Sequence, residues 1–137
     1  MHMKQLLLIT LLVLSSGPAH AEWLLLGGDN QAGMALYLDP GTIRRNGDQV
    51  TMWILYDFKT VQTKEVGDSF LSATIQREYD CRSERTRLLA ITNYSDQMGS
   101  GKMVSTSTFD EPKWVPVAPL EPGTIAQDLW VVACSKR

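Results

Sequence analysis

The sequence has almost no histidine. Its two histidines are His2 and His20, and the chain contains none from residue 21 onward. Histidine is the commonest general base near neutral pH and the commonest metal ligand. Without an imidazole, Ser-His-Asp and Cys-His catalysis are excluded from the body of the chain. We therefore expect no catalytic residue, no metal ligand and no cofactor.

The chain also lacks an excess of charge and a complete nucleotide-binding motif. Its 13 Lys and Arg against 15 Asp and Glu give a formal net charge of -2, so the composition does not favour binding to nucleic acid. Residues 99–102 read Gly-Ser-Gly-Lys, but Asp96 stands where a phosphate loop has its first glycine, and Met103 where it has Ser or Thr. We interpret this stretch as a glycine turn, and we expect no nucleic-acid partner.

The N-terminal segment has the order of a secretory signal. Lys4 supplies a charged start, an apolar run follows from Leu6 to Leu14, and residues 19–21 read Ala-His-Ala, the small-residue pattern that a signal peptidase recognises. A membrane span needs roughly 20 apolar residues, which is more than this run provides. We predict residues 1–21 as a signal cleaved between Ala21 and Glu22, and residues 22–137 as a single domain without a transmembrane segment. No cysteine is present at the cleavage site to carry a lipid, so we expect a periplasmic or secreted protein.

Cysteine is scarce, since the chain has only Cys81 and Cys134. An even number of cysteines in an oxidising compartment indicates a disulfide, and two cysteines allow only one pairing. The alternative is a pair of free buried thiols. A bond closing a loop of this length contributes roughly 4 kcal/mol in the chain-entropy model.

The middle of the chain has the alternating pattern of β-strands. Gln49–Phe58 is the clearest strand, and because both of its faces are apolar we expect it to be central. Phe70–Cys81 alternates apolar and polar residues with Arg77 as the exception, so its polar face, from Ser72 to Asp80, should meet solvent. Further strands are expected at Trp23–Leu26, Met34–Leu38, Arg85–Tyr94 and Lys102–Phe109. Turns are expected at Gly27-Gly28, Asn46-Gly47 and Ser95–Gly101, with a loop over Lys59–Asp68.

The C-terminal part differs from the rest. Residues 110–122 contain four prolines, which exclude a helix or a central strand and indicate an extended connection. After it, Thr124 and Gln127 have the spacing of a helix capping box, and Ile125, Leu129 and Val132 recur at helical spacing. A strand is the competing interpretation, because residues 130–132 read Trp-Val-Val. The predicted fold is mainly β, of the α+β class: an antiparallel meander of about six strands, with one C-terminal helix that the disulfide pins to the sheet.

Two groups of side chains are candidates for surface contacts. Arg77, Arg82, Arg85 and Arg87 gather around one predicted hairpin and present a possible polyanion site, although interleaved acids are equally typical of a solvated face with ion pairs. Of the four tryptophans, Trp53 and Trp130 are expected in the core. Trp23 and Trp114 are expected there too, with exposed anchors as the alternative.

Taken in order, these residues resemble the surface-adhesin E-like family of Gram-negative bacteria. The matching residues extend over nearly the whole predicted domain: Tyr37-Leu38-Asp39, Thr42-Ile43, Arg45, Gly47, Val50, Met52-Trp53, Glu78-Tyr79-Asp80-Cys81, Tyr94-Ser95, Met98-Gly99-Ser100-Gly101, Trp114, Pro116, Leu129-Trp130 and Cys134. The resemblance implies a small, non-enzymatic β-sheet domain of the cell envelope or surface with a cysteine pair. It also implies a protein partner, for which matrix proteins such as fibronectin, laminin and vitronectin are the candidates.

We therefore expect an exported binding module whose ligand-binding residues are unknown. The first alternative is a periplasmic accessory protein that has no adhesive role. The second is a hydrolase that works without histidine, through a pair of carboxylates.

Overall fold

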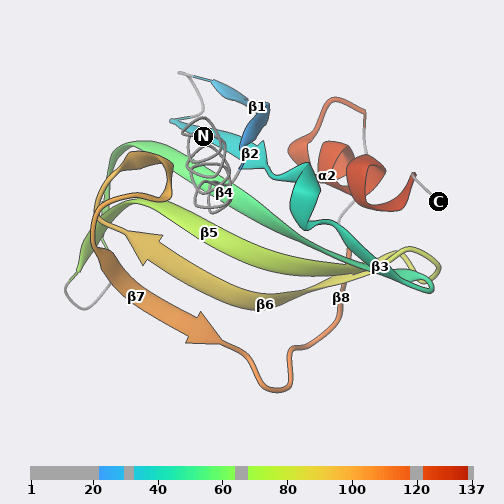
Figure 1. Cartoon of the computed structure of the whole chain (residues 1–137). Helices are drawn as coiled ribbons and strands as arrows, with labels where there is room; N and C mark the ends of the chain where they lie inside the picture. Colours follow the sequence, from blue (N-terminus) through green and yellow to red (C-terminus); the bar gives the residue numbers. More distant parts are fainter. Residues whose placement is uncertain (1–21, 30–32, 64–67, 118–121, 136–137) are drawn as a thin grey trace, which may run out of the picture.

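A computed structural model describes residues 22–29, 33–63, 68–117 and 122–135 (Figure 1). The predicted signal, including Ala21, lies outside these residues. Within the described chain, no helix is long and apolar enough to cross a membrane. The elements in chain order are β1 (Leu24–Asp29), β2 (Met34–Leu38), the 3-10 turn η1 (Pro40–Thr42), β3 (Arg44–Asn46), β4 (Gln49–Thr63), β5 (Ser69–Asp80), β6 (Arg85–Tyr94), the 3-10 turn η2 (Gln97–Gly99), β7 (Met103–Thr108), β8 (Val115–Pro116) and α2 (Ile125–Cys134).

The strands form one antiparallel sheet in the order β1-β2-β4-β5-β6-β7. The two short strands pair away from this path, β3 with β4 and β8 with β6. β4 has neighbours on both sides and is central, as its two apolar faces predict. The mainly β class, the meander and the C-terminal helix are confirmed, and the short strand β8 lies within the proline-rich connection.

The core lies between α2 and one face of the sheet. Val50, Met52 and Ile54 of β4 are fully buried, because alternate residues of a strand point to the same side. Leu129 and Ala133 of α2 pack against them. The helix begins where the capping pattern predicts, with the Thr124 side chain accepting a hydrogen bond from the Gln127 N–H. Helix, and not strand, is therefore the structure of this segment.

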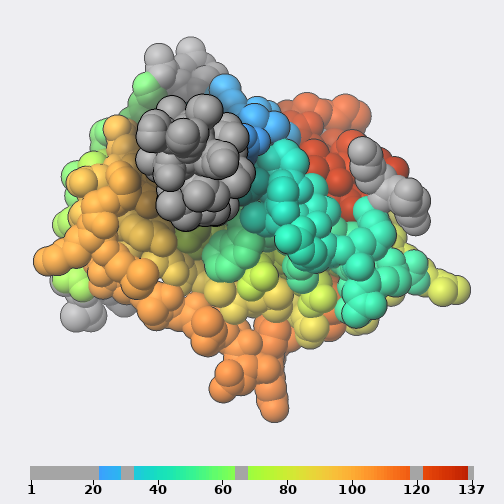
Figure 2. Space-filling view, viewed as in Figure 1, coloured from blue at the N-terminus to red at the C-terminus, as the bar shows by residue number. Residues whose placement is uncertain are grey.

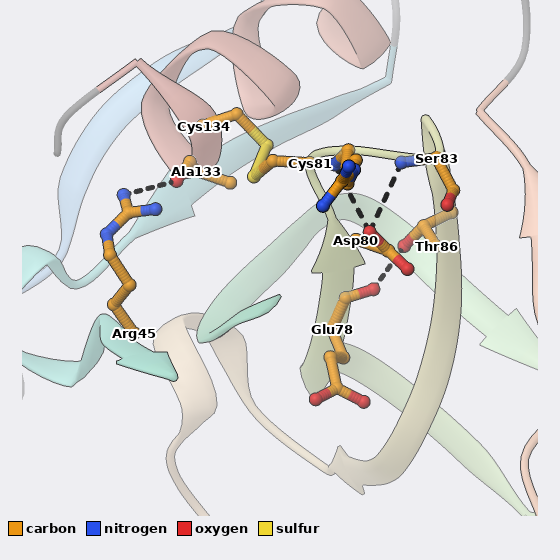
Figure 3. The surroundings of a disulfide bond; sticks show 9 residues. Arg45, Glu78, Asp80, Cys81, Ser83, Thr86, Ala133 and Cys134 are labelled. Carbon is orange, nitrogen blue, oxygen red and sulfur yellow. Dashed lines mark hydrogen bonds between the residues drawn. A yellow bond between two sulfur atoms is a disulfide. The ribbon is translucent and has the colours of Figure 1, made fainter. Parts of the chain in front are cut away.

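The far end of α2 is attached to the sheet by two bonds (Figure 3). Cys134 forms a disulfide with Cys81, directly after β5, with 5.6 Å between the two Cα atoms. Arg45 of β3 donates a hydrogen bond of 3.0 Å to the carbonyl oxygen of Ala133. A positive side chain at a helix C-terminus also interacts favourably with the helix dipole. The predicted disulfide is therefore present, and free thiols are not.

Two predicted turns or loops are strand in the structure. β1 continues through Gly27 and Gly28, with a bulge after Leu25. Gly28 has a φ of 92°, and a Cβ there would meet the backbone of Met34 and Ala35, so the glycine serves the close approach of β2 and does not mark a turn. Lys59–Thr63 is the end of β4, because it pairs with the start of β5 beyond a second bulge. The hairpin at Asn46-Gly47 forms, with residues 47 and 48 as its two-residue loop.

The face of the sheet opposite α2 is not the solvated face that the alternation predicts. Ser72 is fully buried and Asp80 is 7% exposed. The turn that contains η2 folds over Ser72, whose hydroxyl donates to the Asp96 carbonyl at 2.6 Å and accepts from the Gly99 N–H at 2.8 Å. Gly99 has a φ of 66°, which brings the turn close to Leu55 and Thr74. A polar residue in the strand pattern thus marks a docking point for the turn.

Replacing Ser72 with alanine should lower the free energy of unfolding by about 1–3 kcal/mol, because the Asp96 carbonyl and the Gly99 N–H both lose their partner at a fully buried position. Urea denaturation of the purified domain measures the loss. Ser69→Ala, on the exposed first residue of β5, is the matched control and should leave stability unchanged. Equal stability of the two variants would show that water replaces the Ser72 hydroxyl without cost.

Candidate functional site

An open groove lies on the α2 side of the sheet, beyond the part that the helix covers. Its volume is about 480 Å³. Its lining comes from four neighbouring strands, β4 to β7: Tyr56, Phe58, Phe70, Ala73, Ile75, Arg77, Leu88, Ile91, Asn93, Ser105 and Ser107. Most of these side chains are apolar, so the groove offers dispersion and hydrophobic contact to a ligand.

The strand register explains the shape of the groove. One row of paired residues crosses four strands, in the order Ile54, Ile75, Ile91 and Ser107. The next row contains Tyr56, Ala73, Asn93 and Ser105. Alanine and serine are small, so the floor is low toward β7. Buried Asn93 donates a hydrogen bond of 3.0 Å to the Ser105 hydroxyl, which fixes the polar wall at that side.

Three neighbouring aromatic rings line one side of the groove, from Tyr56, which also lines a hollow beside α2, to Phe70. Tyr56 stacks near Phe58, with ring centroids 6.4 Å apart. Phe58 meets Phe70 edge to face at 6.0 Å. All three rings are half-buried, so they present apolar area without needing a hydrogen-bond partner inside the groove.

Among the described residues that line the groove, Arg77 is the one that carries a charge. It is half-buried, and among the described residues it forms no ion pair. It also lines a second hollow, of about 220 Å³, between the sheet and α2, which shares Tyr56 with the groove. A guanidinium on an apolar surface attracts carboxylates and carbonyl oxygens more strongly than one in open water. The groove is therefore suited to a ligand with apolar side chains and a hydrogen-bond acceptor.

The predicted cluster of four arginines is wrong as a single site. Arg77 points to the α2 side, whereas the other three belong to the opposite face or to the β5–β6 turn, because alternate residues of β5 and β6 point in opposite directions. Those three are ion-paired: Arg82 with Asp48 at 3.7 Å, Arg85 with Asp80 at 3.3 Å and Arg87 with Glu78 at 2.7 Å. They thus form ion pairs with the interleaved acids; the Arg82 pair is exposed, whereas the Asp80 and Glu78 side chains are largely buried.

Trp114 lies beside two of these arginines. The guanidinium carbons of Arg85 and Arg87 lie 4.6 Å and 4.1 Å from its ring centroid. These cation–π contacts, together with the pairing of β8 with β6, fix the proline-rich connection to the hairpin. Trp114 is half-buried and serves as an internal anchor.

The expectation that Trp53 and Trp130 are core residues is only partly right, because both are half-buried. Trp130 lies at the edge of the core, and Trp53 lies on the opposite face of the sheet.

Asp80 closes the β5–β6 turn beside the disulfide (Figure 3). Burial alone would raise the pKa of Asp80. The N–H groups of Ser83 and Arg82 and the Arg85 guanidinium outweigh burial and hold the pKa of Asp80 below its usual range. Asp80 is therefore a structural carboxylate. No group of acids, histidines or cysteines that fits a metal ion occurs among the described residues.

Sequence reasoning missed the groove. Its one signal was Arg77, which interrupts the apolar face of the predicted strand Phe70–Cys81. Of the predicted site residues, Cys81 and Cys134 are brought together. Glu22 is described, with its N–H donating to Asp39 at 3.2 Å, and the cleavage site itself stays a prediction because Ala21 lies outside the described residues.

The architecture defines a small antiparallel β-sheet domain with a disulfide-tethered C-terminal helix and an open groove beside that helix. A family model described as surface-adhesin protein E matches residues 23–135, and the chain belongs to this family. It is thus an adhesin-like surface protein, as the resemblance implies.

Solved structures agree with this class. The structure of Haemophilus influenzae protein E is 13% identical, covers 85% of this chain and 86% of its own, and superposes with a TM-score of 0.57. A second crystal form of the same protein is 15% identical, covers 84% of this chain and 97% of its own, and has a TM-score of 0.54. At this identity the likeness extends to the fold alone. No curated protein matches the chain.

Proposed function

We propose that this chain is an exported, non-enzymatic binding module that holds a protein partner in the groove of its sheet. The observation that carries the proposal is the open apolar groove with one half-buried arginine, Arg77, in its lining. Apolar surface with a few placed polar groups is typical of a recognition site. Family membership supports a role at the cell surface, and the partner that we favour is a host matrix protein such as fibronectin, laminin or vitronectin.

Hydrolysis by a carboxylate pair receives no support from the groove. Such an enzyme needs two acids about 5–10 Å apart, one of them with a raised pKa. The described residues of the groove lining include no Asp or Glu, and Asp80, the one described acid with a clear shift, has a lowered pKa. Binding without turnover is therefore the better proposal.

A periplasmic accessory protein without an adhesive role is the remaining alternative. Both functions use the same signal, with the proposed cleavage before Glu22. They differ only in the final location of the mature protein, which is the cell surface for the adhesin and the periplasm for the accessory protein. Protease shaving of intact cells, followed by fractionation, separates the two. Degradation by added protease supports the adhesin, and full protection inside the periplasm supports the accessory protein.

Replacing Arg77 with glutamine should weaken binding of the mature protein to its matrix partner by roughly 10-fold or more, since a charge-assisted hydrogen bond contributes about 1.5–3 kcal/mol. Surface plasmon resonance against immobilised fibronectin, laminin and vitronectin measures the change. Arg82→Gln is the matched control, because the Arg82 side chain is 83% exposed and lies outside the groove. Wild-type affinity of R77Q, with a loss for R82Q, would place the binding surface on the opposite face.

A further inference from the structure

β7 is the last strand of the sheet, and among the described strands it pairs with β6 alone. The sheet order ends with β7, which pairs with β6 on its inner side (Figure 1). In an edge strand, alternate N–H and C=O groups point away from the sheet and are ready to pair with another extended backbone. The connection that follows β7 projects from the body of the molecule (orange in Figure 2), and its described residues lead away from that edge to β8 (Figure 1).

The composition of β7 does nothing to prevent such pairing. Its six residues are Met-Val-Ser-Thr-Ser-Thr, from Met103 to Thr108. Edge strands are normally protected by lysine, by proline or by an inward-pointing charge. None of these occurs within β7; Lys102 stands just before it and Asp110 after it. Most of the strand is exposed.

The groove opens sideways at this same edge. Ser105 and Ser107 point to the groove face, and they pair with Asn93 and Ile91 of β6. A strand added outside β7 would place every second side chain beside these serines, about 4.5–5.5 Å from Cβ to Cβ. Because serine is small, a long apolar side chain of the added strand can extend over β7 and reach Ile91.

We propose that β7 recognises its partner by strand addition: an extended segment pairs with the outer edge, and its alternate apolar side chains lie in the groove. This inference rests on the proposed function and deepens it, since it names the recognition mode. Backbone pairing supplies affinity, and the groove selects large aliphatic or aromatic residues at alternate positions.

A second copy of this chain fits the edge less well than such a segment. In a pair of β7 strands, each copy would offer only Ser105 and Ser107 to the groove of the other. Two serines would leave Ile75, Ile91 and Leu88 uncovered. The occupant is therefore a foreign segment with larger alternate side chains.

The test uses the mature protein and short overlapping peptides of fibronectin, laminin and vitronectin, with the three intact proteins in parallel. Peptides with alternating apolar residues should bind. Alternate N–H groups of a bound peptide face β7, and the others face away from it. N-methylation of the set that faces β7 should abolish binding, and N-methylation of the other set should not. Ser107→Lys should weaken binding by about 10-fold or more, because the long cationic side chain fills the opening beside β7. Hydrogen exchange should show new protection of β7 amides on peptide addition.

The matched control carries the same added charge outside the groove and should bind like the wild type. Val131→Lys, on the exposed face of α2, controls for the added charge. Wild-type binding of S107K to an intact protein would overturn strand addition and leave the proposed function standing. Failure of all peptides and intact proteins to bind would overturn both. Self-association that S107K abolishes, without peptide binding, would make a second copy the occupant and overturn the proposal.

Discussion

Replacing both Cys81 and Cys134 with alanine lowers the free energy of unfolding by about 2–5 kcal/mol, the usual cost of losing a native disulfide from a small exported domain. The bond joins residues 53 apart in the sequence, so the chain-entropy model alone gives about 4 kcal/mol. Marginal stability makes this a large fraction of the total for a single domain.

The helix should suffer most from this change. α2 has only 10 residues, and isolated helices of that length are marginal in water. Leu129, Ala133 and Cys134 are its buried residues, and two of these lie in its last turn, next to the disulfide. Without the disulfide, the Arg45 hydrogen bond to the Ala133 carbonyl oxygen is the remaining polar contact described between that end of the helix and the sheet. We expect α2 to detach while the sheet, with its own paired strands, persists.

Circular dichroism and urea denaturation of the double variant measure both effects, and reduction of the wild-type protein should reproduce them. Either single alanine variant should lose about as much stability as the double variant, because the two cysteines act as one unit. Unchanged stability after reduction would contradict the prediction and show that packing alone holds the helix.

Local patterns predicted most of the elements of this fold. β6 is predicted with its observed bounds, Arg85–Tyr94, from its apolar centre and the glycine turn that follows it, although a bulge between Leu88 and Ala90 interrupts its alternation. The start of α2 follows from the Thr124 cap. The centrality of β4 follows from its two apolar faces. Each of these signals lies within a few residues of the feature that it predicts.

The missed features depend on contacts between distant segments. Ser72 looks like a solvent-facing residue until the turn around η2, more than 20 residues later, folds over it. The groove requires four strands in register and a helix that covers only one end of their shared face. Periodicity specifies which residues share a face, but it does not specify how far α2 extends along it. For the same reason, Arg77 was recognised as an exception in its strand and not as part of a site.

Tyr79 should make the domain sensitive to alkaline pH. It belongs to β5 and is 3% exposed. Its ring packs on the α2 side of the sheet and meets the Trp130 ring edge to face, with 6.0 Å between the centroids. Burial raises the pKa of Tyr79 to about 12; Tyr56 adds to this effect, while Arg77 and the hydrogen bond with Thr86 oppose it. The cause is that a phenolate in the core loses its hydration.

The direction of the pH effect follows from the two pKa values. In the unfolded chain the tyrosine ionises with a pKa of 10.0, and in the folded domain with a pKa of about 12. The folded state therefore holds the proton more tightly. Its contribution to stability is fully present below pH 10 and is lost as the pH rises from 10 to 12. A difference of about two pKa units corresponds to about 3 kcal/mol.

Tyr79→Phe should remove this alkaline loss, because phenylalanine has no proton to release. At neutral pH the variant should lose no more than about 1 kcal/mol, the usual net contribution of one hydroxyl hydrogen bond. Urea denaturation at neutral pH and at about pH 11 measures both quantities. Ser72→Ala is destabilised elsewhere and keeps Tyr79, so it should lose as much stability at alkaline pH as the wild type. If Y79F lost that amount too, another group in the core would be the one that ionises, and the contact between β5 and α2 would tolerate a phenolate.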